Sequence, residues 1–350
     1  MVDRPTIEIV KRSFMADSDH ASWSFTMDLK DDSGNDRHIL EVPDNVIAKF
    51  REDGFVVLPN VLPKDSVHML NDRLEEVLRG RFDREQAPDK IPRRPRNEYS
   101  RTNMSLPPEG AKVLQAKGPL GFTGNTRNVK VLQLINVHKA DATFRKVACH
   151  ELLGQVVAAV AGWPDGARLA QDQVWAKPPR APSLTFHRDA PYFMFTPNPV
   201  VTVWIALDDM KPELGPLEYA RGSHKWGDGR IGGAQQFFSS DGGHDLLRSA
   251  ALAANEKGPL ELITLAGLSA GGISLHDGRT WHGSGKNQSW GQPRRGLGLH
   301  YVPANVRFTA DAAKSRLWKS YVDGVADPES LVLPIEDFPI VWQPPVGSAR

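Results

Sequence analysis

The spacing of hydrophobic residues changes along the chain, from helical in the first half to β-like in the second. In residues 64–79 apolar side chains recur every three or four positions, which predicts an amphipathic helix. Residues 46–53 and 144–161 show the same spacing and are predicted as helices. Between them, residues 54–59 form a short apolar run that ends at a proline and predicts a strand.

From residue 168 onward, short β-prone runs alternate with glycine and proline clusters. Many short strands separated by turn signals are typical of a sandwich or jelly roll rather than of a parallel α/β sheet. We therefore expect a mainly β fold with flanking helices: a jelly roll with an N-terminal helical buttress. The predicted strands cover residues 129–137, 168–175, 184–187, 200–207, 262–265, 272–276 and 296–302.

The pattern divides the chain into three parts. Residues 1–44 are polar and are predicted to form a peripheral N-terminal arm, residues 45–308 the jelly-roll domain with its buttress, and residues 309–350 a C-terminal extension that packs on the domain. Residues 80–124 are rich in Pro, Arg, Gly and Asn and are predicted as a long loop, which is often functional. This loop and the insert at residues 227–255 are expected to shape a substrate pocket.

Composition excludes several classes of protein. Lys and Arg number 43 against 42 for Asp and Glu, whereas a protein that binds a phosphate backbone normally has a basic excess. The single cysteine, Cys149, cannot form an intramolecular disulfide and is predicted to be a buried small side chain. No apolar run approaches the ~18 residues of a membrane helix. We expect a soluble cytoplasmic protein without nucleic-acid or membrane partners; its oligomeric state stays open.

The chemistry is concentrated in His187-Arg188-Asp189 and in the distant His282. Residues i and i+2 of a strand point to the same face, so His187 and Asp189 can approach one ion from a single strand end. A second histidine from another strand completes two imidazoles and one carboxylate. This facial set leaves coordination positions open and suits Fe(II) oxygenases. A His-x-Asp pair alone is a weak signal, because it is common by chance.

An arginine strengthens the interpretation. Arg294 follows His282 by about a dozen residues, which allows it to lie on the next antiparallel strand and to face the same cavity. A guanidinium matches a carboxylate through two parallel hydrogen bonds. A five-carbon keto-diacid needs such an anchor at its far carboxylate while its keto-acid end chelates the iron. The spacing therefore favours Fe(II) with 2-oxoglutarate over iron alone.

The sequence resembles the phytanoyl-CoA dioxygenase-like family of Fe(II)/2-oxoglutarate oxygenases over roughly residues 45–308. Together the matching segments are highly specific, and they occur in the family's order. They are Asp53-Gly54-Phe55-Val56-Val57, Phe186-His187-Arg188-Asp189, Trp204-Ile205-Ala206-Leu207-Asp208-Asp209, Gly215-Pro216-Leu217, Arg221-Gly222-Ser223-His224-Lys225 and His282 to Arg295.

The resemblance implies a double-stranded β-helix, which is a cupin-like jelly roll with the metal at its open end, and it implies a role for each matching position. His187, Asp189 and His282 match the metal ligands, and Arg294 matches the 2-oxoglutarate anchor, with Arg295 as the alternative if the register slips. Trp204, Ser284 and Lys177 fall where the family lines the co-substrate pocket. For the primary substrate, the pocket residues we predict are Tyr192, Phe193, Gln173 and Trp281.

The implied reaction is a dioxygenase reaction that consumes O2, converts 2-oxoglutarate to succinate and CO2, and oxidises a small molecule, most simply by hydroxylation. Family halogenases replace the carboxylate ligand with a small residue, and Asp189 is present here. No basic cluster demands a CoA phosphate, so an acyl-CoA substrate is not implied. The substrate itself, and the choice among hydroxylation, desaturation and ring closure, stay open.

Other interpretations compete with these. His276 is a rival metal ligand, although adjacent strand residues face opposite sides and so His276 and Asp277 cannot both reach one ion. Asp208-Asp209 could be a catalytic carboxylate pair, but its turn-rich surroundings favour the end of a strand. At the level of function, the alternatives are a non-catalytic jelly roll that binds a small molecule or a metal, and a cupin-like enzyme that needs no co-substrate.

Overall fold

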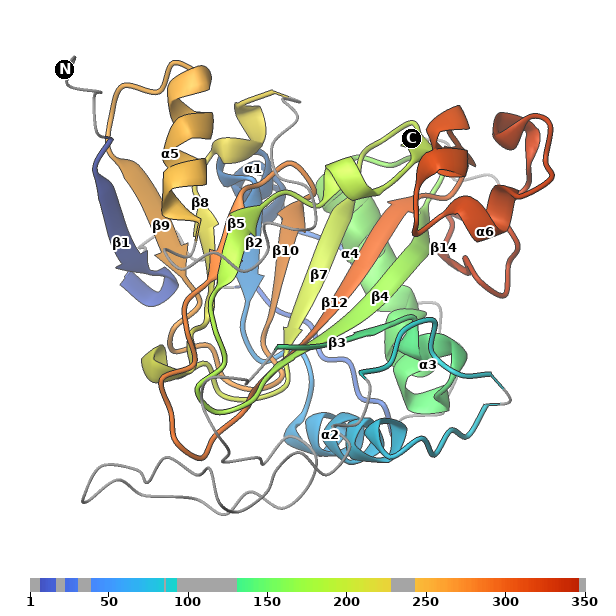
Figure 1. Cartoon of the computed structure of the whole chain (residues 1–350), viewed down its shortest axis with the longest axis horizontal. Coiled ribbons are helices and arrows are strands. Elements are labelled where there is room, and N and C mark those ends of the chain that lie inside the picture. The colour runs from blue at the N-terminus through green and yellow to red at the C-terminus, as the bar shows by residue number, and fades with distance from the viewer. Residues whose placement is uncertain are drawn as a thin grey trace.

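Two β-sheets face each other in the computed structural model, and helices cover the outer side of the larger sheet (Figure 1). The structure describes residues 7–16, 23–30, 39–84, 86–92, 131–227 and 243–345. The larger sheet has the order β14-β4-β12-β7-β10-β2, and β3 pairs with β4. Its strands are β2 (Phe55–Leu58), β3 (Leu132–Ile135), β4 (Ala167–Lys177), β7 (Val201–Ala206), β10 (Ile273–Asp277), β12 (Arg294–Pro303) and β14 (Ile340–Trp342).

The smaller sheet has the order β1-β9-β8-β11-β5. Apart from the parallel pair of β1 and β9, its strands run antiparallel. A two-stranded ribbon of β6 and β13 completes the sheet structure. The strands are β1 (Ile9–Ser13), β5 (Leu184–His187), β6 (Phe195–Thr196), β8 (Leu217–Ala220), β9 (Leu260–Thr264), β11 (His282–Ser284) and β13 (Arg307–Phe308). This is the jelly-roll architecture that the sequence predicts.

The two faces of the larger sheet differ in chemistry because strand residues alternate in direction. In β12, Leu297 and Leu299 belong to the main hydrophobic cluster that the helices cover. The alternate positions of β12 face the smaller sheet. They are Arg294, Gly296, Gly298 and His300. The inner face of the larger sheet is therefore polar and contains two glycines, which leaves room for a site.

The helices confirm most of the predicted pattern. They are α1 (Asp44–Asp53), α2 (Lys64–Leu78), α3 (Ala142–Ala148), α4 (Glu151–Ala161), α5 (His244–Ala253) and α6 (Lys319–Val322). The single helix predicted over 144–161 is wrong: it is divided into α3 and α4, because the His150 side chain accepts a hydrogen bond from Leu152 N and caps α4. Of the helices described, none is long and apolar enough to cross a membrane.

The regions predicted to be irregular are partly ordered. Within the 227–255 insert, residues 244–253 form α5, which contacts β5, and residues 228–242 lie outside the described part. Of the predicted 80–124 loop, residues 80–84 and 86–92 contain no helix or strand, and residues 93–124 lie outside the described part. The predicted strand ranges do not include β1, β6, β8, β11, β13 or β14, each of which has five residues or fewer.

Both ends of the chain pack on the jelly roll. In the N-terminal segment, β1 extends the smaller sheet, and the side chains of Met27 and Leu29 lie in the main core. At the C-terminal end, β14 pairs with β4, and Trp318 and Phe338 cluster with Phe193. Cys149, predicted to be buried, is partly buried, and burial raises the pKa of its thiol to about 11.

Candidate metal and co-substrate site

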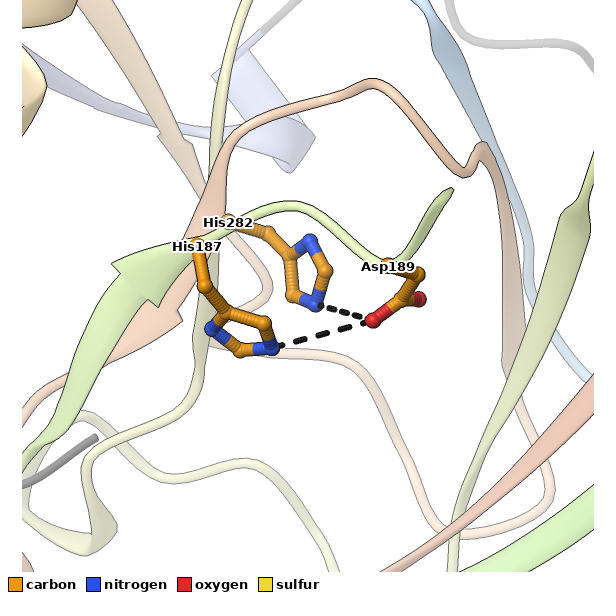
Figure 2. A group of neighbouring side chains, drawn as sticks. All are labelled: His187, Asp189 and His282. Carbon is orange, nitrogen blue, oxygen red and sulfur yellow. Dashed lines mark ion pairs between the residues drawn. The ribbon is translucent and has the colours of Figure 1, made fainter. Parts of the chain in front are cut away.

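The pairing of β5 with β11 brings the two predicted histidines together. His187 at the end of β5 is the register partner of His282 at the start of β11. Their ring centroids lie 4.2 Å apart. Asp189 follows two residues after His187, and its carboxylate turns toward both rings (Figure 2). One ligand atom from each residue lies within 4.8 Å of the other two.

Backbone carbonyls orient both imidazoles. Nδ1 of His187 lies 2.8 Å from the Thr185 carbonyl oxygen, and Nδ1 of His282 lies 3.0 Å from the Thr280 carbonyl oxygen. A carbonyl can only accept, so Nδ1 carries the hydrogen in each ring and Nε2 keeps its lone pair. Both Nε2 atoms lie 3.7 Å from Oδ1 of Asp189 (Figure 2). Three electron-pair donors therefore converge on one point.

Burial sets the charge states that a metal requires. It lowers the pKa of His187 and of His282 to about 4, so both imidazoles are neutral at neutral pH. Burial by itself raises the pKa of Asp189, but the neighbouring His282 and a hydrogen bond from His276 outweigh it and hold that pKa well below its usual range. Metal ligands must be deprotonated, and these three are.

These residues fit a divalent transition metal. At 3.7 Å the imidazole nitrogens and the carboxylate oxygen do not hydrogen-bond to one another. With lone pairs rather than hydrogens facing the carboxylate, only a cation between the three atoms satisfies them all. Two imidazoles and one carboxylate with open positions form the set preferred by non-haem Fe(II) oxygenases.

The second oxygen of Asp189 is held by the larger sheet. Thr202 Oγ1 donates to Oδ2 at 2.7 Å, and His276 Nε2 donates to the same atom at 3.1 Å. Nδ1 of His276 in turn lies 3.1 Å from the hydroxyl of Tyr219. His276, the rival ligand, therefore supports the carboxylate from behind instead of joining the three-residue cluster. Such contacts fix the orientation of a ligand and leave Oδ1 free for the metal.

Two buried cations lie on the inner face of the larger sheet and contact β11, the strand that carries His282. Lys177 and Arg294 are register partners on β4 and β12, and they are 0% and 1% exposed. Lys177 Nζ donates to Ser284 Oγ at 2.7 Å, and Arg294 Nη2 donates to the same oxygen at 3.1 Å. Lys177 Nζ also donates to the backbone carbonyls of Ser284 and Gly285, and no carboxylate of the described residues forms a salt bridge with either cation.

The environment of Arg294 favours a carboxylate ligand. Its Nε is buried without a partner among the described residues, and burial lowers the pKa of the guanidinium to about 10. Its guanidinium carbon lies 5.8 Å from the Trp204 ring centroid. A Cβ on Gly296 would come within 2.3 Å of that ring, so glycine there allows Trp204 to lie flat beside the cation. The predicted co-substrate residues Trp204, Ser284, Lys177 and Arg294 therefore meet.

Arg295, the alternative anchor, points to the other face. Its backbone N–H donates to Oδ2 of Asp208 at 2.7 Å, and its Nε donates to the same atom at 2.9 Å. Asp209 Oδ1 accepts from the backbone of Ala270 at 3.0 Å. Asp208 and Asp209 are thus occupied in structural contacts, and the geometry favours Arg294 as the anchor.

The four predicted substrate-pocket residues do not lie together. Phe193 is buried, with its ring 5.0 Å from that of His300, and Tyr192 beside it is half-buried. Gln173 lies on the inner face of β4, where it bonds to Gln133. Trp281 lies elsewhere: it is packed in the cluster under α5, on the opposite side of its strand from His282. We do not retain Trp281 as a pocket residue.

Several supporting residues were missed by the sequence reasoning. Thr202 and His300 contact each other at 2.9 Å (Thr202 Oγ1 to His300 Nδ1) beside Asp189. Gln171 on β4 is the register partner of His300 on β12. A signal was present in the alternation Arg294-x-Gly296-x-Gly298-x-His300, which places the arginine, both glycines and the histidine on one face of a strand.

Comparisons with known proteins agree with this geometry. A curated relative, a probable α-ketoglutarate-dependent hypophosphite dioxygenase of Stutzerimonas stutzeri, is 29% identical over 142 residues, which is 41% of this chain and 47% of that protein. The match therefore spans less than half of the relative. The crystal structure of SnoN, a non-haem α-ketoglutarate-dependent epimerase from nogalamycin biosynthesis, has a TM-score of 0.57 at 20% identity and covers 85% of this chain and 98% of SnoN.

The carbocyclase SnoK from the same biosynthesis has a TM-score of 0.53 at 19% identity over 85% of this chain and 96% of SnoK. At these identities the two structures establish the fold. Family membership comes from the sequence, because the profile of the phytanoyl-CoA dioxygenase (PhyH) family matches residues 50–296. That interval contains His187, Asp189, His282 and Arg294, and it confirms the predicted resemblance. The chain belongs to the phytanoyl-CoA dioxygenase (PhyH) family.

Proposed function

We propose that this protein is an Fe(II)- and 2-oxoglutarate-dependent dioxygenase that oxidises, most simply by hydroxylation, a small molecule. The observation that carries the proposal is the pairing of two sites on facing sheets, joined by Ser284 of β11, which accepts hydrogen bonds from both cations and lies two residues after His282. One is a cluster of three deprotonated ligand atoms, and the other is a pair of buried cations that lacks a carboxylate partner among the described residues. Fe(II) and 2-oxoglutarate together satisfy both.

Each residue has a separate task in this proposal. His187, Asp189 and His282 hold the ion, and Thr202 with His276 keeps the carboxylate oriented. Arg294 and Lys177 bind the far carboxylate of 2-oxoglutarate beside Ser284 and Trp204. When bound, Fe(II) and 2-oxoglutarate supply the O2 chemistry, with the co-substrate converted to succinate and CO2.

The protein's own contribution is orientation and exclusion of water. The smaller sheet carries the histidine ligands and the facing larger sheet carries the cation pair, so the co-substrate is held at both ends. Phe193 and Trp318 form a ring contact at 5.6 Å beside the site and keep that side apolar. The substrate named for the relative, hypophosphite, is not transferred to this chain. The cytoplasmic location, the lack of a nucleic-acid partner and the three-part domain division remain predictions.

Succinate release is the test of this function. The purified protein is incubated with Fe(II), 2-oxoglutarate and air, and succinate is measured without any added substrate and then with a metabolite library. We expect a slow uncoupled release that depends on iron and on 2-oxoglutarate. A non-catalytic jelly roll would release none, and a cupin-like enzyme would oxidise its substrate with 2-oxoglutarate omitted. Either result would replace the proposal.

A further inference from the structure

A row of amide side chains crosses the inner face of the larger sheet toward the metal cluster. Gln133 Nε2 donates to Gln173 Oε1 at 2.8 Å, and Gln173 Nε2 donates to Gln171 Oε1 at 2.5 Å. At the outer end, Lys90 Nζ donates to Gln133 Oε1 at 2.5 Å. Every bond in this row runs in the same direction. The row therefore ends inside the protein with an N–H2 group, that of Gln171, as a free donor.

His300 provides an acceptor next to that donor. Asp189 Oδ2 can only accept, so the Thr202 hydroxyl donates its one hydrogen to that oxygen at 2.7 Å. Thr202 Oγ1 must then accept from His300 Nδ1, which lies 2.9 Å away. Nδ1 thus carries the hydrogen, and in that tautomer Nε2 retains a lone pair. No described residue hydrogen-bonds to His300 Nε2 or to the Gln171 amide nitrogen.

The two groups lie side by side on the inner face. Gln171 and His300 are register partners, and directly opposed residues of an antiparallel pair have Cβ atoms about 5 Å apart on the same face. A Cβ built on Gly298 would lie 3.8 Å from His300 Nε2, in ordinary contact and without a clash. By contrast, a Cβ on Gly296 would collide with Trp204. A methyl group at position 298 would therefore fit, and it would lie directly against the acceptor nitrogen.

We infer that Gln171 and His300 form a subsite for a hydroxyl group of the primary substrate, and that the substrate is a neutral, hydroxyl-bearing molecule. A hydroxyl both donates and accepts, which matches His300 Nε2 and the Gln171 amide. On the inner faces of the described strands β4, β7 and β12, the only charged side chains are Lys177 and Arg294, which the co-substrate occupies. The inference rests on the proposed function, because it assigns the substrate of the same site.

Binding of matched polyols tests the inference. Glycerol, myo-inositol and methyl glucoside are each compared with the fully O-methylated ether, by anaerobic calorimetry on the protein loaded with Fe(II) and 2-oxoglutarate. We expect at least one polyol to bind about tenfold more tightly than its ether, as expected for one hydrogen-bonded group. Gln171→Met and Gly298→Ala should each remove that tenfold preference. The same Gln-to-Met change at exposed Gln343 should leave it intact.

A 2-oxoglutarate titration of the same samples distinguishes failure of the hydroxyl subsite from failure of the proposed function. If 2-oxoglutarate binds and no polyol is preferred over its ether, or if Gln171→Met and Gly298→Ala both keep the preference, the hydroxyl subsite is wrong and the proposed function stands. If 2-oxoglutarate fails to bind the iron-loaded wild-type protein, the proposed function is wrong, and the inference falls with it.

Discussion

The metal cluster and the cation pair lie on facing sheets and are built in opposite ways. Around His187, Asp189 and His282, every polar atom that does not face the metal has a partner: backbone carbonyls hold both Nδ1 atoms, and Thr202 with His276 holds Oδ2. Around Arg294 the hydrogen bonding is incomplete, because its Nε has no partner among the described residues and its Nη2 shares the Ser284 hydroxyl with Lys177.

This difference shows what each end is built to receive. The metal end is completed except for three converging lone pairs, so it is preorganised for a cation. The other end keeps buried positive charge that is costly without a partner, so it is preorganised for an anion. Fe(II) with bound 2-oxoglutarate supplies both: the ion is the cation, and the far carboxylate is the anion. The following predictions are ordered from the largest expected effect to the smallest.

Asp189→Ala should abolish metal binding and leave the cation pair unchanged. Removal of a group that only supports a ligand costs 10–100-fold in metal affinity, so removal of the ligand itself should cost at least about a hundredfold and reduce succinate release to background. Metal content after dialysis and succinate release measure the two effects. Full turnover by this variant would show that the ion is held elsewhere.

Arg294→Met should weaken the binding of 2-oxoglutarate and leave the metal ligands unchanged. Two charge-assisted hydrogen bonds of about 1.5 kcal/mol each correspond to about a hundredfold higher 2-oxoglutarate requirement. Without ligands the variant should melt at a higher temperature than wild type, because a buried uncompensated charge is gone. Arg295→Met is the matched control. It should remove the side-chain ion pair with Asp208 and lower the melting temperature, with an unchanged 2-oxoglutarate requirement; the reverse pattern would move the anchor to Arg295.

Thr202→Val should keep the shape of the side chain at position 202 but remove its hydrogen bond to Asp189. Loss of the 2.7 Å hydrogen bond to Oδ2 leaves His276 as the remaining close donor, so we expect about a tenfold lower Fe(II) affinity and little change in the 2-oxoglutarate requirement at saturating iron. Metal titration gives the affinity. An affinity equal to wild type would mean that Thr202 does not orient the ligand.

Gly296→Ala and Gly298→Ala should differ although they lie two residues apart. The methyl at 296 would press on Trp204, so we expect a loss of about 1–3 kcal/mol in the free energy of unfolding and a several-fold higher 2-oxoglutarate requirement. The methyl at 298 meets only ordinary contacts and should leave stability within about 0.5 kcal/mol. Chemical denaturation measures both. Equal stabilities would show that Trp204 is not confined as described.

Sequence reasoning predicted the parts of this site that are local in the chain. Helices α1 and α2 follow from the 3.6-residue period. The His-x-Asp pair was predicted from alternation in a strand, and its two side chains do converge, although β5 ends at His187 and Asp189 lies just beyond it with helical backbone angles. The anchor could be narrowed to Arg294 or Arg295 by spacing, but the choice needed the register of β12 against β4. That register depends on the pairing of strands far apart in sequence.

The missed and misplaced residues have the same physical cause. Thr202, Gln171 and His300 acquire their roles only when three strands are aligned side by side. Trp281 is different, because the alternation rule was sufficient to exclude it: a residue adjacent to His282 in an extended segment points to the opposite face. The break between α3 and α4 was hidden because His150 caps a helix through an atypical side chain.

A crystal structure grown without oxygen in the presence of Fe(II) and 2-oxoglutarate tests the central claim most directly. We predict an ion bound by His187 Nε2, Asp189 Oδ1 and His282 Nε2, with the far carboxylate of 2-oxoglutarate on Arg294 and Lys177. An ion on other residues, or a 2-oxoglutarate carboxylate that contacts neither cation, would contradict the account.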